Sequence, residues 1–117
     1  MTPDDLKKRT KDFSHRCVKL ALLLPNDPVS NHIRHQMIRS STSVSANYRA
    51  ACVGHSKAAF TSKISIVVEE IDETAFWIEF LIEEGLLLVR KCESLLGEAR
   101  ELTSIFVASR KTSQNSN

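Results

Sequence analysis

Apolar residues recur in this chain at alternating spacings of four and three, in four separate segments. The pattern is clearest between residues 60 and 81, where it runs through three heptads with a single polar member. Its members are Phe60, Ile64, Val67, Ile71, Thr74, Ile78 and Leu81. Such spacing puts side chains on one face of an α-helix and is typical of helices that pack against one another. The sequence therefore predicts an all-α fold.

Capping and helix-breaking residues predict where the helices begin and end. Thr2 is a good N-cap, Pro25 ends the first apolar pattern, and Gly54 and Gly85 end the next two. The expected helices span about 3–24, 29–53, 56–84 and 90–110, the start of the fourth being the least defined, and a disordered tail is expected at 111–117. Short loops between helices of similar length favour one domain, 1–117, folded as an antiparallel up-and-down four-helix bundle.

The polar stretch at residues 39–47 would be assigned to a loop from its composition alone. The heptad phase nevertheless continues through it and puts Ser40 and Asn47 at positions that face the other helices. Thr74 has the same kind of position on the third helix. We therefore expect Ser40, Asn47 and Thr74 to form a buried polar layer that selects one register of packing.

Charge is divided unevenly along the chain. Residues 1–63 contain eleven Lys or Arg and four Asp, a net charge of +7, whereas residues 64–117 have a net charge of −5. Either the basic and acidic helices neutralise one another inside a protomer, or a basic face remains for nucleic acid. The candidate nucleic-acid-binding residues are Arg16, Arg39, Arg49 and Lys57. Pairing of these arginines with Glu70 and Glu73 is the structural alternative.

The third helix carries more apolar surface than a small bundle can cover, because a second set of apolar residues lies outside the heptad positions. This set comprises Ile66, Val68, Phe76, Trp77, Phe80 and Ile82. Large uncovered apolar patches usually mark an interface, so we expect a closed homo-oligomer with head-to-tail contacts between basic and acidic helices. The candidate interface residues are Tyr48, Phe76, Trp77 and Phe80. Tyr48 and Trp77 could alternatively stack on unpaired bases.

Several motifs resemble the 23S rRNA-intervening-sequence proteins, a family of four-helix bundle proteins, over nearly the whole chain. The most specific are Gln36-x-x-Arg39-Ser40-x-x-Ser43-Val44-x-Ala46-Asn47-Tyr48-Arg49 and Glu70-x-x-Glu73-Thr74-x-x-Trp77, supported by Phe13-x-x-Arg16-x-x-x-Leu20 and Glu98-Ala-x-Glu-Leu102. Ser45 and Ala50 depart from the family pattern, which more often has Gly and Glu there.

This resemblance implies a left-handed antiparallel bundle, bacterial origin and a ring of five protomers, but no known reaction. Some genes of the family lie within extra segments of ribosomal RNA genes. A related branch comprises nucleic-acid-binding accessory proteins of reverse transcriptases. This association alone does not define a mechanism.

Known catalytic and metal-binding motifs are missing from the sequence. It has no nucleophile motif, no Gly-rich phosphate loop and no Glu-x-x-His pair, so we expect no enzyme, no metal, no cofactor and no small-molecule substrate. The three cysteines form no pair in sequence and are expected to be reduced core residues. No apolar run is long enough to span a bilayer, and we expect a cytoplasmic protein. The resulting hypothesis is an oligomeric assembly or accessory protein, with RNA or DNA binding as the alternative.

Overall fold

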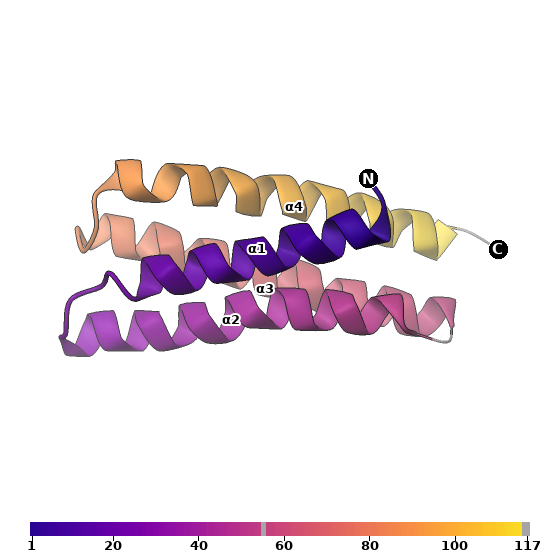
Figure 1. The fold of residues 1–117 in the computed structure, drawn as a ribbon, viewed down its shortest axis with the longest axis horizontal. Coiled ribbons are helices and arrows are strands. Elements are labelled where there is room, and N and C mark those ends of the chain that lie inside the picture. The colour runs from indigo at the N-terminus through magenta and orange to yellow at the C-terminus, as the bar shows by residue number, and fades with distance from the viewer. Residues whose placement is uncertain (55, 116–117) are drawn as a thin grey trace.

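The structure is a computed structural model that describes residues 1–54 and 56–115, and four helices account for most of them (Figure 1). The helices are α1 (Pro3–Ala21), α2 (Pro28–Cys52), α3 (Lys57–Glu83) and α4 (Val89–Asn115). No strand occurs in this part of the chain. The prediction of an all-α four-helix bundle is confirmed.

The four helices lie side by side in an elongated molecule with dimensions of 49 × 21 × 20 Å. Consecutive helices run in opposite directions in Figure 1, as short connections require. Helix α1 contacts α2 and α4, and α3 contacts the same two helices. The helices therefore form a four-sided arrangement in which α1 and α3 occupy diagonal corners.

Side chains at the helix ends satisfy backbone groups that the helices leave without partners. At the start of α1, Thr2 and Asp5 form a reciprocal capping box, and the hydrogen bond from the Thr2 backbone lowers the pKa of Asp5. Asp27 caps α2 by accepting a hydrogen bond from the Ser30 backbone N–H, with 2.8 Å between nitrogen and Oδ1, which lowers the pKa of Asp27. After α3, Gly85 has a φ of 70°, a conformation that glycine adopts without strain.

Helix α1 ends earlier than predicted. Its last residue is Ala21 rather than Leu24, and Leu22 follows as the C-cap. Leu24 is still buried, because the chain turns and directs this side chain into the core after the helix has ended. The residue before a proline is disfavoured in helical conformation, and Leu24 precedes Pro25.

Helix α4 continues further than predicted. It extends to Asn115, so the expectation of disorder is wrong for residues 111–115, while residues 116–117 lie outside the described part of the chain. Ser113 is buried, and its Oγ lies 2.7 Å from Oγ of Thr61 on α3. This contact and the absence of Pro or Gly after Gly97 explain why the helix continues.

The buried face of α2 differs from the prediction at one position. The prediction placed Asn47 at the seam, but Asn47 is only half-buried and its Nδ2 donates to the carbonyl and hydroxyl oxygens of Ser43 on the same helix. Tyr48 is 4% exposed, and its ring packs against Phe106 with centroids 5.1 Å apart. The prediction that Asn47 belongs to a buried polar layer is therefore wrong.

Small polar residues bring α1 and α2 close together. Ser14 Oγ donates to the Ser41 carbonyl oxygen at 2.6 Å and lies 2.7 Å from Ser45 Oγ. Ser14 and Ser41 are both buried. A larger side chain at either position would separate the two helices, so these serines determine the spacing of the α1–α2 pair.

Candidate nucleic-acid interface

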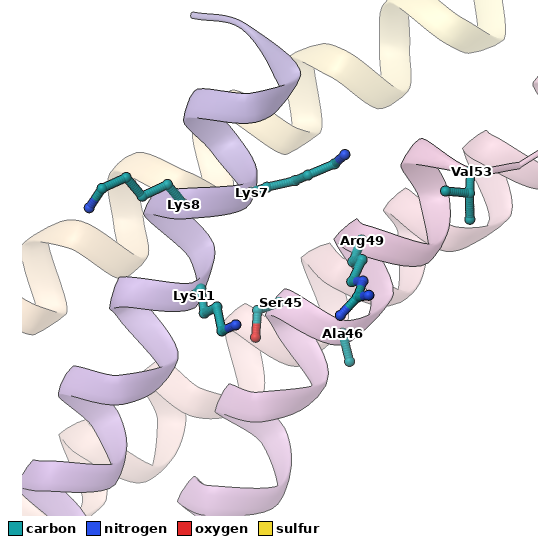
Figure 2. Close-up of a pocket in the computed structure, with 7 residues that line it drawn as sticks. All are labelled: Lys7, Lys8, Lys11, Ser45, Ala46, Arg49 and Val53. Atoms are coloured by element: carbon teal, nitrogen blue, oxygen red, sulfur yellow. The ribbon is translucent and has the colours of Figure 1, made fainter.

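A groove between the first half of α1 and the second half of α2 carries four cationic side chains (Figure 2). Its volume is about 650 Å³. It is lined by Lys7, Lys8, Lys11, Ser45, Ala46, Arg49 and Val53. Four of the seven lining residues are positively charged and none is acidic, so the groove is suited to an anion.

Lys7 and Lys11 share one side of α1 because they are four residues apart, and Lys8 lies one position further round the helix from Lys7. Figure 2 shows Lys11 directed toward Ser45 and Arg49 extending along α2 toward Ala46, whereas Lys8 points away from α2. Small side chains at Ser45 and Ala46 leave room beneath the cations. The bottom of the groove is therefore lined by small side chains, and basic residues stand on both the α1 and the α2 side.

Two of the cations are held only by exposed ion pairs. Lys8 Nζ lies 2.9 Å from Asp12 Oδ2, and Lys7 Nζ lies 3.8 Å from Asp4 Oδ1. Exposed pairs of this kind contribute little and are readily exchanged for another anion. Lys11 makes no hydrogen bond or ion pair through its side chain with any residue that the structure describes.

Arg49 resembles Lys11 in this respect. Its guanidinium has no hydrogen-bond or ion-pair partner within residues 1–54 and 56–115. Lys11 and Arg49 thus provide two positive charges, one on each wall, that no carboxylate of the described chain neutralises.

Of the four predicted nucleic-acid contacts, only Arg49 lines this groove. Arg39 pairs across the bundle with Glu70, at 3.0 Å between Nη1 and Oε2, and with Glu73. The hydrogen bond to Glu73 raises the pKa of Arg39. Arg39 therefore has the structural role that the sequence offered as the alternative.

The other two predicted contacts lie elsewhere. Arg16 donates from Nη2 to Ser94 Oγ at 2.8 Å, on the side of α1 that faces α4. Lys57 is an exposed residue at the start of α3. The structure does not bring Arg16, Arg39, Arg49 and Lys57 together into one surface.

The remaining residues of the two most specific motifs meet between α2 and α3. Ser40 and Thr74 are fully buried, with 2.8 Å between their hydroxyl oxygens. Trp77 Nε1 donates to Glu73 Oε2 at 3.2 Å, which adds the indole to the Arg39 ion pair. The motif residues on the two helices thus form one connected set of contacts.

A comparison with known families matches residues 5–108 to the family described as 23S rRNA-intervening sequence protein. The chain belongs to this family. The contacts between α2 and α3 give its two motifs a structural explanation, because each motif supplies one side of the same helix interface.

Among solved structures, the chain is similar to a protein of unknown function from the S23 ribosomal protein family of Bacteroides thetaiotaomicron. The two share 30% sequence identity and a TM-score of 0.86, over 95% of this chain and 99% of the other. A comparison with curated proteins found no match. The family assignment is consistent with the fold and carries no known reaction.

The aromatic residues of this 23S rRNA-intervening sequence family member lie away from the basic groove. Phe76 is 51% exposed, and its ring centroid lies 4.9 Å from that of the half-buried Trp77. Phe80 and His32 also contact Trp77. Tyr48 belongs to the protomer core, so its predicted role at an interface or in base stacking is wrong.

The sequence did not single out the three lysines of the groove or the ion pairs of Arg9. The available signal was Lys7 and Lys11 at helical spacing on the side of α1 next to its apolar face. Arg9 likewise flanks the seam, a position from which charged residues commonly pair with a neighbouring helix. Its partners, Glu98 and Glu101, could not be identified without knowing which helices are neighbours.

Within residues 1–54 and 56–115, no three His, Cys, Asp or Glu side chains are grouped so that they could hold a metal ion. In the same part of the chain, no helix is both long and apolar enough to cross a membrane.

Proposed function

We propose that this protein is a non-catalytic accessory protein that binds the sugar-phosphate backbone of nucleic acid in the groove between α1 and α2. The observation that carries this proposal is that Lys7, Lys8, Lys11 and Arg49, from two helices, line one groove that has no carboxylate among its lining residues. Cations clustered in this way attract phosphates and release the counterions condensed on them.

The composition of the groove favours backbone contacts over contacts with bases. No aromatic side chain lines it, so it has no platform on which an unpaired base could stack. Lysines act as flexible point charges, and Arg49 can make a bidentate contact with one phosphate. We therefore expect binding that depends weakly on base sequence.

The proposal predicts how strongly the affinity for nucleic acid depends on salt concentration. If the groove neutralises about three to four phosphates of a duplex, the affinity should fall by about 40- to 150-fold between about 50 and 200 mM salt. Fluorescence anisotropy with a labelled RNA or DNA duplex measures this dependence directly.

The variant Lys11→Glu/Arg49→Glu tests the site. It should weaken binding at least tenfold at low salt, because it reverses both unneutralised charges. The matched control is Arg100→Glu/Lys111→Glu, which makes the same change of charge at exposed positions of α4 outside the groove. Equal losses in the two variants would show that net charge, and not this groove, controls binding.

A second candidate function is that of a self-assembling scaffold, and it is favoured by an aromatic cluster of the exposed Phe76 and the half-buried Trp77 and Phe80. The rings of Phe76 and Phe80 lie 5.9 Å apart, and Phe76 remains 51% exposed. Exposed aromatic groups of this size are typical of protein interfaces. We expect a closed homo-oligomer, a ring of five by resemblance to the family. Light scattering should give several times the protomer mass of 13.1 kDa. A species of one protomer mass at low micromolar concentration would refute the scaffold.

A further inference from the structure

Ion pairs join α1 to α4 at one end of the seam between the two helices. Arg9 donates two hydrogen bonds to Glu98, with 2.8 Å from Nε to Oε2 and 2.7 Å from Nη2 to Oε1. Its Nη2 also lies 2.8 Å from Glu101 Oε1. Charges of opposite sign therefore join the two helices at this end.

At the other end of the same seam, the charged residues that line the groove between the two helices are all cations. A groove of about 300 Å³ opens there, lined by Arg16, Lys19, Leu20, Leu23, Lys91, Ser94 and Leu95. Arg16 contacts Ser94, and the side chains of Lys19 and Lys91 have no ion-pair or hydrogen-bond partner among the described residues. Cations from α1 and α4 thus share one groove without a carboxylate among its lining residues.

The floor and edge of this groove are apolar. Leu20 and Leu95 form a buried floor, while Leu23 is 57% exposed at the edge. Leu22 and Leu88, in the nearby connections, are also exposed. A nucleic acid would leave these leucines uncovered, whereas an amphipathic helix with acidic and apolar residues would match both the cations and the leucines.

The chain itself presents such a helix surface. On α3, Phe76 and Phe80 lie one turn apart, and Asp72, Glu79 and Glu83 are exposed around them. None of these three carboxylates takes part in an ion pair within the described residues. We call these five residues the α3 ridge.

Within one molecule, the α3 ridge cannot contact the α1–α4 groove. Helix α3 lies diagonally opposite α1 and is not packed against it. Both surfaces lie at the end of the bundle that carries the α1–α2 and α3–α4 connections, on the left in Figure 1. Two copies side by side could therefore bring ridge and groove together at the same height.

We infer that the α3 ridge of one copy docks into the α1–α4 groove of a second copy. Phe76 and Phe80 contact the leucines, and Glu79 and Glu83 neutralise Lys19 and Lys91. The two surfaces differ, so the contact is head-to-tail and each copy retains a free ridge and a free groove until a ring closes. This inference rests on the proposed self-assembly and specifies its interface.

Charge reversal tests the interface by light scattering. Lys19→Glu/Lys91→Glu should reduce the measured mass to that of one protomer, 13.1 kDa, and so should Glu79→Lys/Glu83→Lys. Combining the four substitutions in one chain restores opposite charges and should restore the mass of the wild-type oligomer. Circular dichroism confirms that each variant remains helical.

One control and four outcomes complete the test. The variant Arg100→Glu/Lys111→Glu makes the same change of charge at exposed positions of α4 outside the α1–α4 groove and should keep the wild-type mass. A wild-type oligomer that neither reversal affects overturns this interface but leaves self-assembly standing, whereas a monomeric wild type overturns both. A helical four-substitution variant that stays monomeric also overturns the interface. Loss of RNA binding without loss of mass in Lys19→Glu/Lys91→Glu would assign the α1–α4 groove to nucleic acid instead.

Discussion

Replacing Thr74 by valine would remove a buried hydroxyl while keeping the shape of the side chain. Thr74 Oγ1 lies 2.8 Å from both Ser40 Oγ and the Glu70 carbonyl oxygen, and Ser40 has no other hydrogen-bond partner among the described residues. Both side chains are fully buried. The substitution therefore leaves the Ser40 hydroxyl buried without a partner.

The expected loss of stability differs between the two residues, because in the described part of the chain Thr74 has two hydrogen-bond partners and Ser40 has one. Thr74→Val should lower the free energy of unfolding by about 1 to 3 kcal/mol, because an unsatisfied buried hydroxyl loses its hydration without compensation. Ser40→Ala should cost about 0.5 to 1.5 kcal/mol, because Thr74 keeps its bond to the Glu70 carbonyl. In the double variant no orphan hydroxyl remains at position 40. Its destabilisation should fall short of the sum by about 1 kcal/mol, or about 4 °C in melting temperature.

Guanidinium chloride denaturation, followed by circular dichroism at one fixed protein concentration, measures these differences. Thr103→Val is a matched control, because Thr103 Oγ1 makes the same kind of bond to the Ala99 carbonyl, at 2.8 Å, but is only half-buried. It should cost less than Thr74→Val. Additivity of the two single substitutions within about 0.3 kcal/mol would refute the coupling between Ser40 and Thr74.

Three other predictions concern the core and its edges. Ile71→Ala should cost about 2 to 5 kcal/mol in the same denaturation assay, because Ile71 is fully buried and the substitution leaves a cavity; a cost below about 1 kcal/mol would contradict its place in the core. Asn47→Ala should change stability by less than about 0.5 kcal/mol and leave the mass in solution unchanged, since Asn47 bonds only within its own helix; a change of mass would show that Asn47 helps to select how helices pack. A thiol reagent at pH 8 should label Cys52 in the native protein but reach Cys17 and Cys92 only after denaturation, because burial raises the pKa of Cys17 to about 12 and also raises that of Cys92. Rapid labelling of all three thiols under native conditions would show that the core opens readily.

Heptad spacing predicted the core face of α3 residue by residue from Ile64 to Leu81, because that helix alternates its spacings without ambiguity. On α2 the same alternation predicted Asn47 after Val44, whereas the structure buries Tyr48, one residue further on. The larger ring is the residue that is buried, since it removes more apolar surface from water. Periodicity alone could not decide between two adjacent positions.

Leu24 shows a different limit of the sequence pattern. It continues the apolar spacing of α1 and lies in the core, but it is not helical. A pattern of burial therefore predicts which side chains enter the core more reliably than it predicts the backbone that carries them there.

The candidate site was less predictable than the fold. The charge division between residues 1–63 and 64–117 allowed either neutralisation within the protomer or a free basic face, and the groove depends on which helices are neighbours and on how close they lie. Arg39 and Arg49 belong to the same motif and were given the same two alternative roles from the sequence. Only the position of Glu70 and Glu73, across the bundle from Arg39, distinguishes these roles. Such pairings need the three-dimensional arrangement.

The close approach of α1 and α2 at Ser14 and Ser41 has a consequence for how the molecule opens. Helix α1 is joined to α2 by buried hydrogen bonds, whereas its hydrogen bonds and ion pairs to α4 involve exposed and half-buried groups around Arg9 and Arg16. Local unfolding should therefore begin by parting α1 from α4, with α1 and α2 staying together as a hairpin. In hydrogen exchange, amides of α1 near Ser14 would then be protected longer than those of α4 near Lys91, and high salt would widen the difference by screening the Arg9 ion pairs.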